Sequence, residues 1–152
     1  MTSSKKVAVV TGAASGIGKA TSAAFAAAGF HVFGLDIDAQ GGARVQGELT
    51  QAHGQSAFTY VAVDLGSRES ILQAANTILA QVPAVDAIVN AAGWDRIEPF
   101  VNNTPEFMEK VMQINLMGPI ALTQALLPSM IQAGSGKIVN VASDAGRVGS
   151  MG

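Results

Sequence analysis

The residues best suited to chemistry lie in a glycine-rich turn near the amino end. Thr11-Gly12-Ala13-Ala14-Ser15-Gly16-Ile17-Gly18 follows an apolar run and opens a helical segment. Glycines permit a tight turn and a close backbone approach to a pyrophosphate, and the N–H groups at a helix amino terminus attract anions. The spacing differs from the common G-x-G-x-x-G, and it lacks the Gly-Lys-Ser/Thr ending of a triphosphate-binding loop. We interpret the turn as a dinucleotide phosphate site, with a purely structural strand-to-helix turn as the alternative.

Such a turn needs a strand before it and a helix after it, and the whole sequence repeats that alternation. Short β-branched runs that end at polar or glycine residues indicate buried strands; they cover residues 7–10, 31–35, 58–63, 87–89 and 137–141. Helical periodicity covers residues 15–28, 39–53, 67–81 and 104 to about 133. In the last helix we expect a kink at Pro119 and an end to the regular part at Pro128.

Five strand–helix alternations with short connections predict an open parallel sheet covered by helices on both faces. The expected strand order is 3-2-1-4-5. Hydrophobic residues make up 49% of the chain and charged residues 13%, which suits a sheet buried on both faces and excludes a disordered chain. No linker or repeat is evident, so we expect residues 1–152 to form one domain whose sheet is incomplete on the C-terminal side.

Charge and cysteine content exclude several classes of function. The net charge of −2 gives no basic surface for nucleic acid or an anionic membrane. The absence of cysteine excludes disulfides, thiolate metal ligands and a cysteine nucleophile, and no metal site is expected. The apolar run at residues 7–10 is too short for a signal peptide or a membrane span. We therefore expect a cytoplasmic protein without nucleic-acid or membrane partners.

Five short features occur in one order along the chain. They are the glycine-rich turn, Asp64-Leu65, Asn90-Ala91-Ala92-Gly93, Asn115 and Ser143. Together they resemble the short-chain dehydrogenase/reductase family of single-domain enzymes, and the resemblance covers all 152 residues. It implies a Rossmann-type doubly wound fold and a nicotinamide dinucleotide cofactor. The implied reaction interconverts a secondary alcohol and a ketone.

The resemblance also implies which nicotinamide cofactor is used. Asp36 ends the second expected strand, where a carboxylate can accept hydrogen bonds from both ribose hydroxyls of NAD and would repel the 2′-phosphate of NADP. NADP-dependent relatives often carry a basic residue where this chain has Ser15. Both positions favour NAD, although Arg44 would weaken the argument if it folded back toward Asp36.

The family pattern assigns cofactor contacts along the chain. Asp64 and Leu65 would touch the adenine, whereas Asn90 and its neighbours would stabilise the sheet and line the ribose side. For Asn90, a purely structural hydrogen bond is an alternative compatible with that role. The full expected set is Gly12, Ser15, Gly16, Ile17, Gly18, Asp36, Ile37, Asp64, Leu65, Asn90, Ala91 and Gly93.

The family's catalytic groups are matched in part. A serine hydroxyl holds the substrate oxygen, and Ser143 matches it by its place after the fifth strand; Ser150 is a weaker rival. An asparagine in a helix holds a water of the proton relay, and Asn115 matches it, with a polar cap of the helix kink as the alternative. The family's Tyr-x-x-x-Lys proton donor would fall just past Gly152, and the only tyrosine, Tyr60, lies in the third expected strand.

We therefore expect residues 1–152 to be the NAD-binding, N-terminal part of a longer dehydrogenase, and to be inactive alone. An incomplete sequence, a proteolytic product or a portion of a longer chain would each account for this. The full-length enzyme is expected to be a homotetramer, as family members commonly are.

Two loops suggest a substrate class. Residues 93–100 and 144–149 resemble family members similar to 2-hydroxycyclohexanecarboxyl-CoA dehydrogenase. Arg96 or Arg147 could then meet a phosphate of CoA; the simpler interpretation is that each pairs with a nearby acidic residue, namely Asp95, Glu98 or Asp144. Two other functions stay open: an NADPH-dependent 3-oxoacyl-thioester reductase of the same family, and a non-catalytic dinucleotide-binding fragment.

Overall fold

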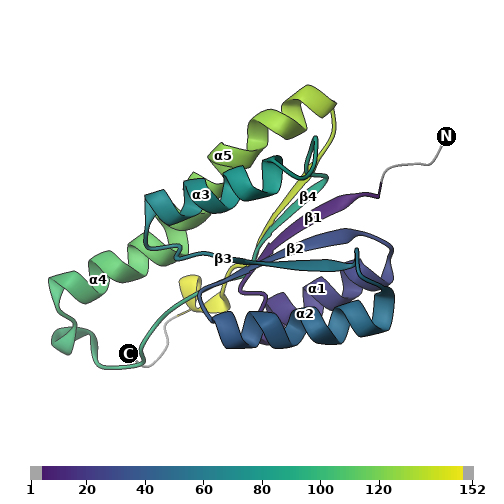
Figure 1. Cartoon of the computed structure of the whole chain (residues 1–152). Helices are drawn as coiled ribbons and strands as arrows, with labels where there is room; N and C mark the ends of the chain where they lie inside the picture. Colours follow the sequence, from purple (N-terminus) through teal and green to yellow (C-terminus); the bar gives the residue numbers. More distant parts are fainter. Residues whose placement is uncertain (1–4, 149–152) are drawn as a thin grey trace.

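Five parallel strands form a single twisted sheet in the order β3-β2-β1-β4-β5 in the computed structural model, which describes residues 5–148 (Figure 1). The strands are β1 (Val7–Thr11), β2 (His31–Asp36), β3 (Phe58–Ala62), β4 (Ala87–Asn90) and β5 (Lys137–Asn140). This arrangement confirms the Rossmann-type fold and the strand order expected from the sequence.

Helices cover both faces of the sheet. In Figure 1, α1 (Gly16–Ala27) and α2 (Ala39–His53) lie on one face, and α3 (Arg68–Leu79) and α5 (Gly118–Ala133) lie on the other. The remaining helix, α4 (Pro105–Met112), extends beyond the sheet. Short 3-10 turns cover Phe100–Asn102 and Asp144–Gly146.

The expected helix starts are built by local hydrogen bonds. Ser67 accepts from the Ser70 N–H at 3.2 Å, and Thr104 accepts from the Phe107 N–H at 3.2 Å. Each side chain satisfies one of the donors that a helix leaves unpaired in its first turn. These two N-caps confirm that α3 and α4 begin where the sequence places them.

Both faces of β1 are buried, which explains its uninterrupted apolar sequence. Val7 and Val9 belong to the core under α3 and α5, whereas Ala8 and Val10 belong to the core under α1 and α2. The period of two follows from the alternation of side chains along a strand. Burial on both sides holds the strand that precedes the glycine-rich turn at the centre of the molecule.

The parallel register brings the functional loops to one edge of the sheet. Thr11 lies opposite Leu35, and Asn90 lies opposite Asn140. The carboxyl ends of β1, β2, β4 and β5 therefore finish side by side. In open α/β sheets, ligands bind outside this edge.

The helical run from Pro105 to Ala133 is continuous but irregular. A π-helical turn over Gln113–Met117 separates α4 from α5, just before Pro119, whose ring nitrogen cannot donate to the carbonyl four residues back. The expected distortion near Pro119 is thus a π turn. The prediction that Pro128 ends the regular part was wrong, because α5 continues through Pro128 to Ala133. Burial of Leu126 and Met130 on either side of Pro128 holds the helix against the sheet.

By length and composition the same run passes as a membrane span, with 29 residues and a mean hydropathy of 1.3. Apolar residues of α5, however, are buried in the core. Leu122 and Leu126 are fully buried in the core that α5 shares with α3 and the sheet. In this structure the α5 part of the run is a core helix.

Candidate active site

The glycine-rich turn is shaped by close approaches that only glycine allows. Gly12 has a φ of +70°, and a Cβ there would lie 3.0 Å from the Ala92 Cα. A Cβ on Gly18 would lie only 2.1 Å from the Gly12 carbonyl oxygen. The turn therefore packs directly on the start of α1 and on the loop after β4.

The amino terminus of α1 is left open for a ligand. Ser15 is the N-cap residue, but its side chain makes no capping hydrogen bond. The N–H groups of the first turn, including those of Ile17 and Gly18, therefore have no side-chain cap. Together with the positive end of the helix dipole they suit a phosphate group.

Asp36 joins the end of β2 to the glycine-rich turn. Its Oδ2 accepts from the Ala14 N–H at 2.9 Å, and its Oδ1 accepts from the Asp38 N–H at 3.0 Å. Each carboxylate oxygen has a second lone pair, so both can still accept a hydrogen bond from a ribose hydroxyl. The carboxylate is thus held in place by backbone groups.

Tyr60 is the only tyrosine in the sequence, and it has a structural role. Its hydroxyl donates to the Asp36 carbonyl oxygen at 2.9 Å. Burial, followed by the charges of Asp36 and Asp38, raises the pKa of Tyr60 above its ordinary value. A catalytic proton donor in this chemistry needs a lowered pKa, so Tyr60 does not fit that role.

These groups line one cleft of about 670 Å³ across the carboxyl ends of β1, β2, β3 and β4. Most of the expected cofactor-binding residues lie in its wall: Gly12, Ser15, Gly16, Ile17, Gly18, Asp36, Ile37, Asp64, Leu65, Ala91 and Gly93. Ile17 and Ile37 are 61% and 70% exposed. Apolar side chains exposed on a cleft wall suit the flat rings of a dinucleotide. Arg44 is not among the lining residues.

Asn90 is the exception in the expected set. Its side chain is buried on the other side of β4, where Nδ2 donates to Asn140 Oδ1 at 2.8 Å and to Thr123 Oγ1 at 3.4 Å. Its Oδ1 has no hydrogen-bond partner among the residues that the structure describes. Asn90 thus joins β4 to β5 and α5, which is the structural alternative considered for it.

Thr11 organises the loop after β4. Its buried Oγ1 accepts from the N–H groups of both Ala91 and Ala92, each at 3.0 Å. Sequence analysis quoted Thr11 as part of the motif but assigned no contact to it. The threonine at the end of β1 fixes the backbone that forms the floor of the cleft.

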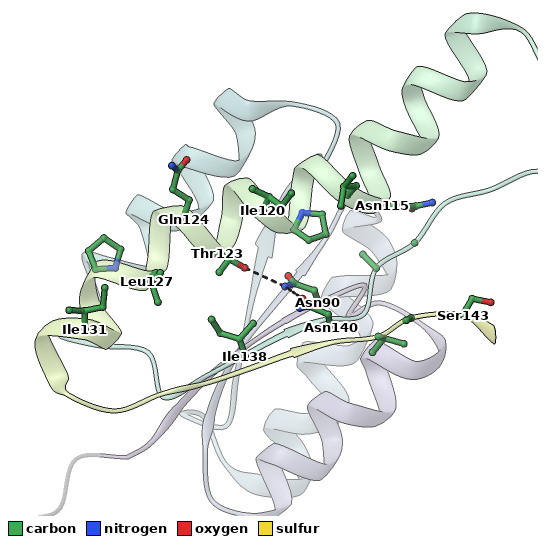
Figure 2. A pocket seen from close by; sticks show the side chains of 17 residues that line it. Asn90, Asn115, Ile120, Thr123, Gln124, Leu127, Ile131, Ile138, Asn140 and Ser143 are labelled. Carbon is green, nitrogen blue, oxygen red and sulfur yellow. Dashed lines mark hydrogen bonds between the residues drawn. The ribbon is translucent and has the colours of Figure 1, made fainter. Parts of the chain in front are cut away.

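A second pocket of about 950 Å³ lies between α5 and β5 and contains both expected catalytic residues (Figure 2). Ser143 and Asn115 lie at the same end of it, at the carboxyl end of β5. Asn90 and Asn140 form a polar floor, and apolar residues such as Ile120 line the rest. Ala92 and Gly93 line both pockets, so the loop after β4 lies between the two spaces.

Among the residues that the structure describes, the Ser143 hydroxyl accepts one hydrogen bond and donates none. Its Oγ accepts from the Ala145 N–H at 3.2 Å and so caps the turn over Asp144–Gly146. Because the hydroxyl oxygen acts here as an acceptor, its hydrogen can donate to a substrate oxygen. Ser150, the rival for this role, lies outside the described residues.

The Asn115 side chain is hydrogen-bonded to the loop after β4. Its Nδ2 donates to the Trp94 carbonyl and its Oδ1 accepts from the Trp94 N–H, both at 2.8 Å. Asn115 lies in the π turn, where the irregular helix turns the side chain toward this loop. The amide thus links the loop between the two pockets to the long helix, a contact that the sequence did not indicate.

Aromatic and basic side chains extend this link outward. The Trp94 and Phe107 ring centroids are 5.5 Å apart, and the Lys110 ammonium lies 4.3 Å from the Trp94 centroid. Sequence analysis missed that Lys110 and Ile114 line the dinucleotide cleft. The two residues are four apart and directly precede Asn115, so a helical pattern would have placed them on one helix face near that residue.

The arginines considered for CoA binding are paired within their own loops. Arg96 contacts Glu98 at 2.6 Å, and Arg147 contacts Asp144 at 3.5 Å. The Arg96 guanidinium also lies 4.6 Å from the Phe107 ring centroid. The simpler interpretation of both arginines is therefore confirmed. Within residues 5–148 no group of three or more His, Cys, Asp or Glu could hold a metal ion.

The glycine-rich turn, the uncapped amino terminus of α1 and the fixed Asp36 carboxylate share one cleft at the carboxyl edge of a parallel sheet, the arrangement that is typical of Rossmann-type α/β proteins. The family model for short chain dehydrogenases matches residues 6–152. The chain belongs to the short-chain dehydrogenase family.

Known relatives support this membership. The chain is 36% identical over 143 residues to a D-threitol dehydrogenase of Mycolicibacterium smegmatis, covering 94% of this chain and 54% of the relative. It is 38% identical over 140 residues to an NAD-dependent glycerol dehydrogenase of Listeria innocua, covering 92% and 53%. A crystal structure of a metagenomic short-chain oxidoreductase in complex with NADP matches with a TM-score of 0.89 and 32% identity, covering 95% and 65%. The chain thus spans about half the length of these curated relatives.

Proposed function

We propose that residues 1–152 are the NAD-binding domain of an oxidoreductase that interconverts a secondary alcohol and a ketone. The observation that carries the proposal is the cleft in which the open amino terminus of α1 faces the same space as the Asp36 carboxylate. A diphosphate would lie at the glycine-rich turn, and Asp36 would accept hydrogen bonds from the adenosine ribose.

We propose NAD rather than NADP as the cofactor. Asp36 would repel a 2′-phosphate at the ribose, and its neighbours in the cleft, Ser15 and Ile37, are not basic. The relative from Listeria is named NAD-dependent, which supports the proposal, whereas the metagenomic relative was solved with NADP. The carboxylate at the end of β2 is the observation in this chain that supports NAD.

In the proposed reaction the bound nicotinamide supplies the hydride chemistry. Ser143 would donate its hydroxyl hydrogen to the substrate oxygen, since its Oγ already accepts from Ala145. A donor fixed where negative charge develops on the substrate oxygen stabilises the transition state. Asn115 would hold the Trp94 loop, and with it the wall between cofactor and substrate.

The finer features of the proposal concern substrate and assembly. A hydroxyacyl-CoA thioester is one proposed substrate, although Arg96 and Arg147 would first have to leave their carboxylate partners to reach a phosphate. We also propose a cytoplasmic homotetramer for the full-length enzyme. Exposed Met108, Met112 and Met117 on the long helix, which line neither pocket, support a subunit contact there.

Calorimetric titration with NADH and NADPH tests the cofactor assignment. We expect the chain to bind NADH more tightly, and Asp36→Asn to shift the ratio of the two Kd values at least about tenfold toward NADPH, roughly 1.4 kcal/mol. Asp95→Asn removes the same charge outside the cleft and should leave the ratio unchanged. A preference of the original chain for NADPH would instead favour the 3-oxoacyl-thioester reductase. Binding of neither cofactor would refute the proposal.

The intact mass of the folded protein and an activity assay test the rest. We expect a chain of 15.5 kDa to bind NADH without turnover. A longer product with the same amino-terminal sequence should oxidise secondary alcohols. Tight NADH binding without turnover in that longer product would indicate a non-catalytic dinucleotide-binding module.

A further inference from the structure

The dinucleotide cleft has an unusual balance of charge. Asp36 and Asp64 place two carboxylates in its wall, and Lys110 is the only basic side chain among the residues that line it. The expected ligand carries a diphosphate with two negative charges. A cation in this wall is therefore placed where it can offset the repulsion between the ligand and the two carboxylates.

The Lys110 ammonium does not form the ion pair that its place in α4 would favour. Glu106 lies four residues earlier on α4, the best arrangement for a helical ion pair. Within residues 5–148, however, Lys110 is in no ion pair. Hydrogen bonding to its own N–H, followed by that to Thr104, lowers the pKa of Glu106. The Lys110 ammonium lies instead over the Trp94 ring, 4.3 Å from the centroid.

The Trp94 ring is itself fixed in the wall of the cleft. Asn115 bonds both the N–H and the carbonyl of Trp94 at 2.8 Å, and the Phe107 ring packs against the indole. An ammonium over a fixed aromatic face is stabilised without losing its charge. Trp94 thus holds the Lys110 cation at the edge of the cleft.

Lys110 lies on the side of the cleft that faces β3. It lines an adjoining hollow together with Asp64 and Gly66, which follow β3, and with Glu106 and Glu109 of its own helix. In the strand order β3-β2-β1-β4-β5, β3 and the Asp36 end of β2 are on one side of β1, and Ser143 after β5 is on the other. The adenosine half of a dinucleotide would occupy the β3 side.

We propose that Lys110 is a further cofactor-binding residue, whose ammonium, held by Trp94, attracts the phosphorylated adenosine half of the dinucleotide. The inference rests on the proposed dinucleotide binding and adds a contact to it. Because α4 joins the sheet only through the loop after β4 and the π turn, this contact also ties α4 to the ligand.

The test uses calorimetric titration of the chain with NADH and with ADP-ribose, which lacks the nicotinamide. We expect Lys110→Met to weaken both ligands by the same factor, about three- to tenfold at low ionic strength, with the difference shrinking as salt screens the charge. Lys110→Arg should bind like the original chain, and Lys110→Glu should bind more weakly than Lys110→Met. Lys110 is exposed, so these variants should fold.

Lys6→Met is the matched control, because Lys6 also lies over an aromatic ring, 6.0 Å from the Phe30 centroid, but at the opposite end of the sheet. It should leave both affinities unchanged. Equal binding by Lys110→Met and the original chain at every salt concentration would overturn the inference alone, and a loss confined to NADH would overturn the adenosine assignment. Failure of the original chain to bind any dinucleotide would overturn the proposed function and this inference together.

Discussion

The close packing of Gly18 on the glycine-rich turn makes a quantitative prediction for Gly18→Ala. An added Cβ would lie 2.1 Å from the Gly12 carbonyl oxygen, 2.5 Å from the Gly12 carbonyl carbon and 2.8 Å from the Thr11 carbonyl oxygen. All three are backbone atoms, so no side-chain rotation can relieve the overlap. The turn and the start of α1 must move apart by at least about 1 Å to reach ordinary contact distance.

Two opposing effects determine how much Gly18→Ala changes the free energy of unfolding. Alanine is favoured over glycine inside a helix by about 1 kcal/mol. Overpacking in a closely packed region costs about 1–3 kcal/mol, and this overlap is with backbone. We expect the overlap to dominate, so that Gly18→Ala lowers the free energy of unfolding by about 1–2 kcal/mol.

Thermal unfolding and NADH titration measure the two consequences. For a chain of this size, 1 kcal/mol corresponds to about 2–4 °C in Tm. We expect Gly18→Ala to lower Tm and to weaken NADH binding at least about tenfold, because the displaced N–H groups no longer converge on the diphosphate. Gly47→Ala is the control: its Cβ meets nothing within 4 Å in the middle of α2. It should raise the free energy of unfolding by about 0.5–1 kcal/mol.

An unchanged or raised Tm for Gly18→Ala, together with unchanged NADH affinity, would refute the claim that the turn and α1 are in backbone contact. A lowered Tm with unchanged affinity would confirm the packing but separate it from phosphate binding. Only a loss of both supports the turn as the diphosphate site.

Three further predictions concern groups around the cleft. Thr11→Val should cost about 1–3 kcal/mol, because two partly buried N–H groups lose their acceptor, whereas Thr11→Ser should retain most stability; calorimetric unfolding distinguishes them. Asn115→Ala should cost about 1–3 kcal/mol and red-shift the emission of Trp94, the only tryptophan; an unchanged spectrum would contradict the link between them. Burial, followed by the charge of Lys5, lowers the pKa of His31. Its contribution to stability should therefore be complete above about pH 6.5 and be lost as the pH falls toward the folded-state pKa. Urea midpoints at pH 7.5 and 5.5 should differ less for His31→Gln than for the original chain.

The local sequence was sufficient for the fold and for the position of the glycine-rich turn between β1 and α1. Runs such as residues 7–10 are apolar without alternation, and this pattern has few solutions besides a strand buried on both faces. Thr104-Pro105 predicted a helix start, because a threonine N-cap followed by proline involves only residues within one helical turn. The glycines of the turn were likewise informative, because their function depends on the space around their own backbone.

The partners of polar side chains were decided by tertiary structure. The structural hydrogen bonds considered for Asn90 involve Asn140 and Thr123, which lie 50 and 33 residues further along the chain and come near only through strand pairing and helix packing. Asn115 bonds to Trp94 because the π turn alters the direction of its side chain, and no periodic pattern announces such a turn. Pro128 was expected to end α5, yet burial of the residues around it outweighs the missing hydrogen bond.

The sequence by itself determined the order of strands and helices, the position of the glycine-rich turn and the residue types that end each strand. Only the tertiary structure decided which of these residues share a cleft, and it added Lys110 to that cleft. The physical reason is that local preferences and tertiary contacts act over different distances along the chain. Strand, helix and cap preferences act within a few residues, whereas the contact of Lys110 with Trp94 depends on how α4 lies against the loop after β4.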